Sequence, residues 1–92
     1  MSERKVKQLE VYAIKDTKVG FWKPFIQPNE AVAIRDFANM VNSTDDRFVR
    51  DNFADLELYR LGYFDDTTGV IETDVSFIAS GISLKRRGEE NG

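Results

Sequence analysis

The stretch DLELYRLGYFDDTTGVIE, residues 55–72, contains two strand-like runs joined by a turn. Two runs rich in strand-forming residues, LELYRLGYFD (56–65) and VIETDV (70–75), flank the turn sequence DDTTG (65–69). An Asp at the start of such a turn accepts backbone N–H bonds, and Gly69 can adopt the left-handed conformation that the turn requires. The stretch therefore predicts an antiparallel hairpin.

The first third of the chain repeats this arrangement. LEVYAIKD (9–16) alternates as a strand does, TKVG supplies a turn in which Gly20 can take a positive φ, and FWKPFIQ (21–27) returns as a second strand. Pro24 has no N–H to donate to a sheet, so we expect that strand at a sheet edge or at a bulge.

A helix is predicted between the two hairpins, over AVAIRDFANMV (31–41). Asn29 is a favourable N-cap, and Glu30 suits the positive end of the helix dipole. The apolar stripe expected to lie on the sheet consists of Ala31, Ile34, Phe37, Ala38 and Val41. The polar segment DDRFVRDNFAD (45–55) is expected to cross back to the hairpin, pinned by Phe48 and Phe53.

These elements predict an α+β fold: an antiparallel sheet of four to five strands in the order ββαββ, with one helix packed on one face. VSFIASGISL (75–84) is read either as a fifth strand or as a segment packed across the sheet. We expect one domain over residues 1–84, with a short basic N-terminal arm, followed by a flexible polar tail over 85–92.

The composition excludes several classes of site. The 92 residues contain no Cys and no His, so disulfides, thiolate nucleophiles, histidine bases and the usual zinc sites are ruled out. The carboxylates lie mainly in turns and no catalytic spacing is evident, so we expect no enzyme, no metal and no cofactor. The net charge of −3 argues against a dedicated duplex-DNA binder. No apolar run reaches membrane-spanning length, which favours a soluble cytoplasmic protein.

Both predicted central strands have apolar side chains on both faces, yet one helix can cover only one. We assign Val11, Ala13, Leu56 and Leu58 to the helix side, because the small Ala13 would let the helix approach. A second surface would then be formed by Tyr12, Ile14, Tyr59, Leu61, Tyr63 and Trp22.

Three interpretations of that second surface are open. Residues 75–84 could fold across it; a homo-oligomer, first of all a dimer, could bury it; or its aromatic rings could stack on bases of single-stranded DNA. The aliphatic Ile14 and Leu61 among the rings favour an oligomer interface, for which we name Tyr12, Ile14, Tyr59, Leu61 and Tyr63. Lys15 is a further possible source of positive charge for DNA. For nucleic-acid contacts we name Trp22, Lys23, Tyr59, Arg60, Tyr63, Lys85, Arg86 and Arg87, and the terminal cluster Arg4, Lys5 and Lys7 could also hold phosphates.

The segments LEVYAIKD, FWKPFIQPNEAVAIRDFANMVN and ELYRLGYFDDTTGVIE occur in this order over roughly residues 8–73. Together they resemble the small nonstructural protein of gokushovirus-type microviruses, which are phages with circular single-stranded DNA genomes. Some members of that family carry the label DNA-binding protein. The resemblance implies a protein of the host cytoplasm, absent from the virion, that acts in phage DNA replication or packaging. It identifies no functional residues.

The sequence thus predicts a non-enzymatic phage accessory protein that forms oligomers, binds single-stranded DNA and serves viral DNA replication or packaging. The alternative is an adaptor that binds viral or host replication and packaging proteins and never contacts DNA. No membrane partner is expected.

Overall fold

The structure is a computed structural model that describes residues 8–43 and 45–86. These residues form β1 (Gln8–Asp16), β2 (Gly20–Phe21), β3 (Phe25–Gln27), α1 (Glu30–Asn42), α2 (Arg47–Asn52), the 3₁₀ turn η1 (Phe53–Asp55), β4 (Leu56–Asp65), β5 (Ile71–Ser80) and α3 (Gly81–Leu84). The strands form a five-stranded antiparallel sheet, so the predicted α+β class is confirmed.

One edge of the sheet is an interrupted strand. The order is β2-β1-β4-β5, and β3 pairs with the other half of β1. The N–H of Trp22 still donates to the carbonyl of Ile14 at 2.8 Å, but the backbone leaves the sheet from Trp22 to Pro24 before β3 begins. The expectation that Pro24 lies at an edge is confirmed, because a residue without an N–H is tolerated where no strand follows on that side.

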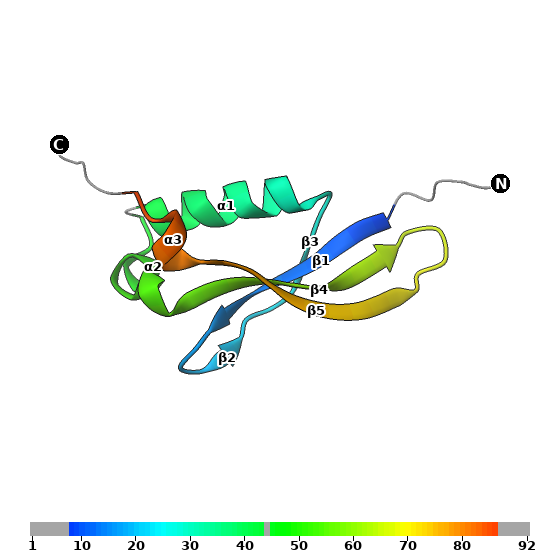
Figure 1. Ribbon diagram of the computed structural model, residues 1–92, viewed down its shortest axis with the longest axis horizontal. Coiled ribbons are helices and arrows are strands. Elements are labelled where there is room, and N and C mark those ends of the chain that lie inside the picture. Colours follow the sequence, from blue (N-terminus) through cyan, green and yellow to red (C-terminus); the bar gives the residue numbers. More distant parts are fainter. Residues whose placement is uncertain (1–7, 44, 87–92) are drawn as a thin grey trace.

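The β4–β5 hairpin forms where the quoted sequence places it. Asp65 accepts hydrogen bonds from the N–H groups of Thr67 (2.8 Å) and Thr68 (3.3 Å), and Gly69 has a φ of 81°. The predicted break at residue 75 is wrong, because β5 continues from Ile71 to Ser80. The chain then turns into α3 beside α1 and η1 (Figure 1). The C-terminal segment therefore pairs with β4 and does not cross the sheet.

Local capping fixes the helices. The side chain of Asn29 accepts a hydrogen bond from the N–H of Val32 at 2.9 Å, which confirms the predicted N-cap of α1. The helix α2 forms within the segment that the sequence predicted only as a polar crossing. At its start, the side chain of Asp46 accepts a hydrogen bond from the N–H of Val49 at 3.2 Å. The side chain of Val49 is buried, so one cap and one apolar anchor suffice for this short helix.

The helices α1, α2 and α3 lie on one side of the sheet (Figure 1). The core between them consists of Tyr12, Ile14, Ala33, Phe37, Val41, Val49, Leu56 and Leu58. Of the residues in the predicted apolar stripe of α1, Phe37 and Val41 are buried but Ala31 is exposed. The alanine that is buried is Ala33, which lies outside the predicted stripe. The helix is therefore rotated slightly from the predicted orientation.

The faces of β1 are the reverse of those predicted. Tyr12 and Ile14 pair with Arg60 and Leu58 and lie in the core, whereas Val11 and Ala13 are on the opposite face. A tyrosine can be buried when its hydroxyl has a partner, and the Tyr12 hydroxyl donates to Glu10 Oε1 at 2.6 Å. The prediction that Leu56 and Leu58 lie on the helix side of the sheet is confirmed, since both belong to the core.

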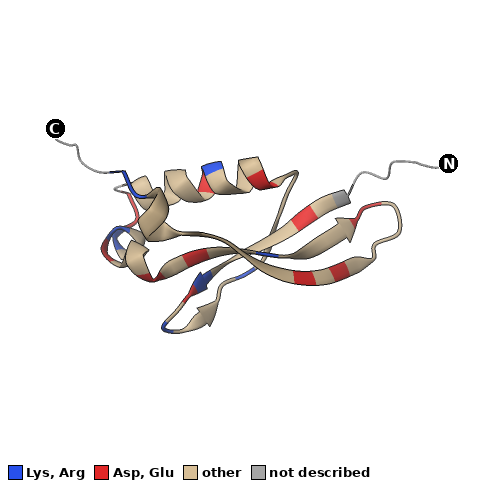
Figure 2. Ribbon diagram, viewed as in Figure 1, with Lys and Arg blue, Asp and Glu red and all other residues tan. Residues whose placement is uncertain are grey.

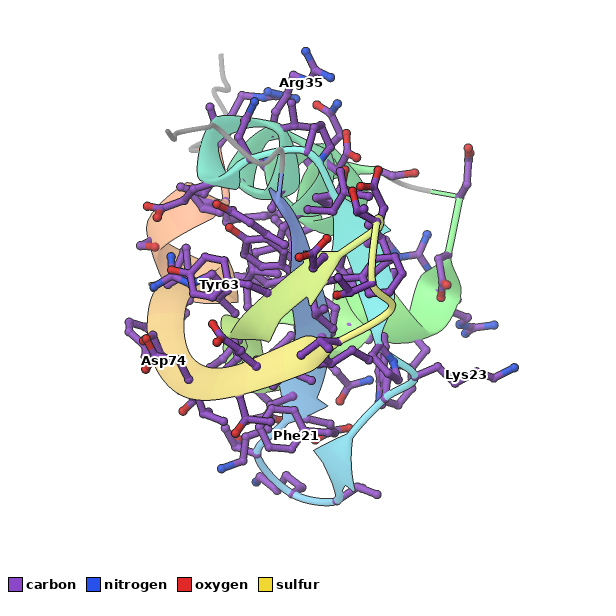
Figure 3. All side chains as sticks on the ribbon, turned by 90° about the vertical axis from the view of Figure 1, so that its right-hand side faces the viewer. Phe21, Lys23, Arg35, Tyr63 and Asp74 are labelled. Carbon is purple, nitrogen blue, oxygen red and sulfur yellow. The ribbon has the colours of Figure 1, made fainter. Side chains whose placement is uncertain are left out.

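A bulge in β4 reverses the alternation of side chains along that strand. Val11 pairs with Gly62 and Tyr12 with Arg60, so Leu61 has no partner on β1. Beyond Leu61, Tyr63 pairs with Glu10 and therefore shares the helix side with Tyr12. Figure 3 shows Tyr63 on the side of the sheet that faces α1, and Phe21 on the other side.

Candidate interaction face on the uncovered side of the sheet

The sheet surface opposite α1, called the open face below, is not covered by any helix of the described chain (Figure 1). Strand pairing, with alternation along β5 for Val75, assigns to it Leu9, Val11, Ala13, Lys15, Phe21, Ile26, Glu57, Tyr59, Phe64, Ile71, Thr73, Val75 and Phe77. Apolar side chains predominate in this set. The open face is therefore the candidate functional site.

Three rings form an aromatic cluster at one end of the open face: Phe21, Tyr59 and Phe77. Tyr59 is central, with its centroid 5.3 Å from that of Phe21 and 5.7 Å from that of Phe77, and both pairs meet edge to face at 78°. The outer rings are accessible, since Phe21 is 47% and Phe77 54% exposed. Ala13, the partner of Tyr59 on β1, is fully buried. Its small size is consistent with the rings resting directly on the sheet.

A cation lies against this cluster. Lys15 Nζ is 5.6 Å from the centroid of Phe21 and 5.7 Å from that of Tyr59, within the range of cation–π attraction. The Tyr59 hydroxyl donates to Glu57 Oε1 at 3.2 Å. Burial of the phenol and the nearby Glu57 carboxylate raise the pKa of Tyr59, so its ring stays neutral at physiological pH. The cluster thus combines neutral aromatic surface with an adjacent positive charge.

Charge is distributed unevenly between the two ends of the sheet. Lys15 and Lys18 lie at the β1–β2 turn, and Lys23 follows β2. The β4–β5 hairpin at the other end of the long axis carries the acidic side chains of Asp65, Asp66, Glu72 and Asp74 (Figure 2). The end of the open face with the aromatic cluster is called the basic end below because of these three lysines, although the carboxylates of Asp16 and Glu57 lie beside Lys15. The hairpin end is called the acidic end. Its Glu72 pairs with Tyr63 and so lies on the helix side of the sheet, as does Asp74 between Thr73 and Val75.

Several predicted site residues lie elsewhere. Tyr12 and Ile14 are in the core, so their assignment to an outer surface is wrong. Trp22 packs against the core, with its ring 6.1 Å from that of Phe48. Tyr63 faces the helix side, where the guanidinium of Arg60 lies 5.3 Å from its ring.

Arg60 is also occupied within the fold. Its Nη1 lies 3.4 Å from Glu30 Oε1 at the start of α1, and its side chain is only 17% exposed. This guanidinium therefore links β4 to α1. The expectation that Arg60 lies on the same surface as Tyr59 is wrong, because the two residues alternate across the sheet.

The other named residues differ in accessibility. Tyr59 is on the open face, Lys23 is exposed and points away from the sheet in Figure 3, and Leu61 is half-buried at the bulge. Lys85 Nζ donates to the carbonyl of Val41 at 3.0 Å and lies 4.9 Å from the ring of Phe53.

At the C-terminal end, the backbone N–H of Arg86 donates to Asn42 Oδ1 at 2.7 Å, so Lys85 and Arg86, which the sequence placed in the tail, are both bonded to α1. Arg4, Lys5, Lys7 and Arg87 lie outside the described residues.

Sequence reasoning missed Phe21 and Phe77. A signal for Phe77 was present: Ile71, Val75 and Phe77 occupy alternate positions, as one face of a single long strand would require. For Phe21, the signal was the turn at residues 17–19. A hairpin with that turn pairs Phe21 with Lys15 and therefore places both side chains on the same face of the sheet.

Within residues 8–43 and 45–86, no group of acidic side chains is arranged to hold a metal ion, and no pocket is present. None of the described helices is long and apolar enough to cross a membrane.

Residues 9–84 match the family described as Phage ORF5 protein, so the match extends from the start of β1 to the end of α3. No curated protein and no solved structure matches the chain. Since the matched region includes every strand residue of the open face and most of the sequence, the chain belongs to the Phage ORF5 protein family.

Proposed function

We propose that this phage protein is a non-enzymatic accessory factor in viral single-stranded DNA replication or packaging, and that it contacts single-stranded DNA at the basic end of the open face. It would act in the host cytoplasm and not as part of the virion. The observation that carries the proposal is the aromatic cluster with Lys15 against it.

The half-exposed rings of Phe21 and Phe77 suit base stacking, because every base offers a π-face and no sequence readout is needed. Stacking on an aromatic side chain contributes about 1–3 kcal/mol per base. Two outer rings flanking Tyr59 could receive two or three unpaired bases, whereas stacked duplex bases would be inaccessible to them.

The positive charges at the same end would bind phosphates. Lys15, Lys18 and Lys23 would supply about three contacts, which predicts a slope near −2 for log affinity against log salt with single strands. The carboxylates at the β4–β5 hairpin would repel DNA, so the strand would be confined to the basic end. This division is how a chain of net charge −3 could bind a polyanion.

Fluorescence anisotropy of a labelled single-stranded oligonucleotide, titrated with the protein at two or more salt concentrations, tests the proposal. Phe21→Ala and Phe77→Ala should each weaken binding by roughly 5- to 150-fold, from the stacking energy of one base. Phe48→Ala is a matched control, because Phe48 is 49% exposed but lies on α2, on the other side of the sheet.

Absence of salt-sensitive binding by the wild type would contradict DNA contact. The alternative, an adaptor for viral or host proteins, is favoured by one observation: Ile71 and Val75 at the acidic end are aliphatic and 59% and 60% exposed. An adaptor would retain a protein partner from infected cells, and Val75→Asp would abolish that retention without any DNA being bound.

A further inference from the structure

The open face exposes several large apolar side chains to solvent. Its five exposed large side chains are Phe21 (47%), Ile26 (46%), Ile71 (59%), Val75 (60%) and Phe77 (54%). With about 200 Å² for a complete Phe and somewhat less for Ile and Val, they leave about 400–500 Å² of apolar surface in water. The largest apolar patch of a typical monomer is about 300–600 Å² and is often functional.

This area agrees with what a protein dimer needs. A standard interface buries about 800 Å² per partner. About 65% of a homodimer interface is apolar, which amounts to about 500 Å² on each side. The open face can supply this area without unfolding any part of the chain.

A second copy offers the same five apolar side chains, so a two-fold symmetric pair buries both sets at once.

We propose that a second copy of this chain packs on the open face, as two sheets pack face to face in a sandwich. The interface centre is the row Ile71, Val75 and Phe77 of β5 together with Phe21 and Ile26. Tyr59 lies beneath the outer rings and becomes fully buried.

The dimer covers the aromatic cluster, and this has a consequence for the DNA contact. Resting on the proposed function, the inference is that a second copy and single-stranded DNA compete for the same surface. The protein is then a dimer when free, and DNA dissociates it into DNA-bound monomers. The apparent affinity for DNA falls as the protein concentration rises above the dimer dissociation constant.

Sedimentation of the full chain from low micromolar to several hundred micromolar concentration tests the dimer without DNA. The expected mass approaches twice 10.6 kDa. Val75→Asp and Phe77→Asp should weaken self-association by more than tenfold. Ile82→Asp should not, because Ile82 is 61% exposed on α3, on the helix side. Circular dichroism confirms that each variant is folded.

A monomer mass at every concentration, or a dimer that survives both Val75→Asp and Phe77→Asp, overturns the proposed interface. The competition is measured separately, by sedimentation with a fluorescent oligonucleotide. If no DNA binds, the proposed function is contradicted, but the dimer is still supported if the mass measured without DNA is that of two chains. If DNA binds and the dimer persists, the shared surface is wrong.

Discussion

Tyr59 on β4 pairs directly with Phe77 on β5, and the two rings meet edge to face, 5.7 Å between centroids, on the side of the sheet that no helix covers. Their neighbours in sequence, Leu58 and Ile78, contribute to the core on the other side. Along these two strands, Leu58 and Ile78 therefore stabilise the core, while Tyr59 and Phe77 form a surface that is available for interaction. The consequences of that division are measurable.

Ile14→Asp should unfold the protein. Ile14 is 6% exposed within the core, and an unpaired carboxylate there would cost at least about 4 kcal/mol. A domain of this size is typically stable by about 5–10 kcal/mol. Val19→Asp is the control, because Val19 in the β1–β2 turn is 83% exposed. Thermal unfolding followed by circular dichroism measures both; a folded, smaller Ile14→Asp particle would mean that β1 faces the other way.

Gly62→Ala should destabilise the sheet by about 2–3 kcal/mol, because an added Cβ would meet the backbone carbonyl of Glu72 and β5 would have to move. For a domain of this length that corresponds to a loss of roughly 10–20 °C in Tm. Gly69→Asn is the comparison: it has open space and a φ of 81°, which Asn tolerates. Equal Tm values for the two variants would show that β4 and β5 do not approach closely at Gly62.

The elements that sequence reasoning located are those fixed by neighbouring residues. The N-cap at Asn29, the turn at Gly69 and the edge position of Pro24 each depend on local backbone chemistry, and each is confirmed. The α2 helix was missed because its pattern is short and polar, and only Asp46 and the buried Val49 support it.

Local sequence patterns could not predict which face of each strand packs against α1. Val11 and Tyr12 are both apolar enough for a core, so alternation alone does not say which one faces α1. The bulge at Leu61 then reverses the face for Tyr63, and a bulge depends on pairing with a strand far away in sequence. Of the residues named for the second surface, Tyr59 is on the open face, and Phe21 and Phe77 replace Tyr12 and Tyr63 beside it.

Substitution of Lys85 should affect the stability of the protein, whereas substitution of Lys15 should affect DNA binding. Lys85 donates to the Val41 carbonyl near the end of α1, so Lys85→Met should lower the free energy of unfolding by about 1 kcal/mol. It should leave single-stranded DNA binding unchanged. Lys15→Met should weaken DNA binding and reduce the salt slope by about 0.7, the value of one phosphate contact. Titrations at several salt concentrations decide this, and a reduced slope for Lys85→Met would return that residue to the DNA site.

Alkaline pH should destabilise the protein through Tyr12. Burial raises the pKa of its phenol, and the nearby Glu10 carboxylate raises it further. In the unfolded chain the phenol has its ordinary pKa of about 10. Above that pH the unfolded state loses a proton that the folded state keeps, so stability is complete below about pH 10 and falls as pH rises. The slope is up to about 1.4 kcal/mol per pH unit.

Tyr12→Phe removes this group, so the difference in unfolding free energy between wild type and variant should shrink steadily above about pH 10. Other titrating groups are common to both proteins and cancel in the difference. Urea unfolding at a series of pH values measures it. A difference that stays constant through the alkaline range would show that the Tyr12 phenol ionises equally well in the folded and unfolded states, and hence that Tyr12 is not in the core.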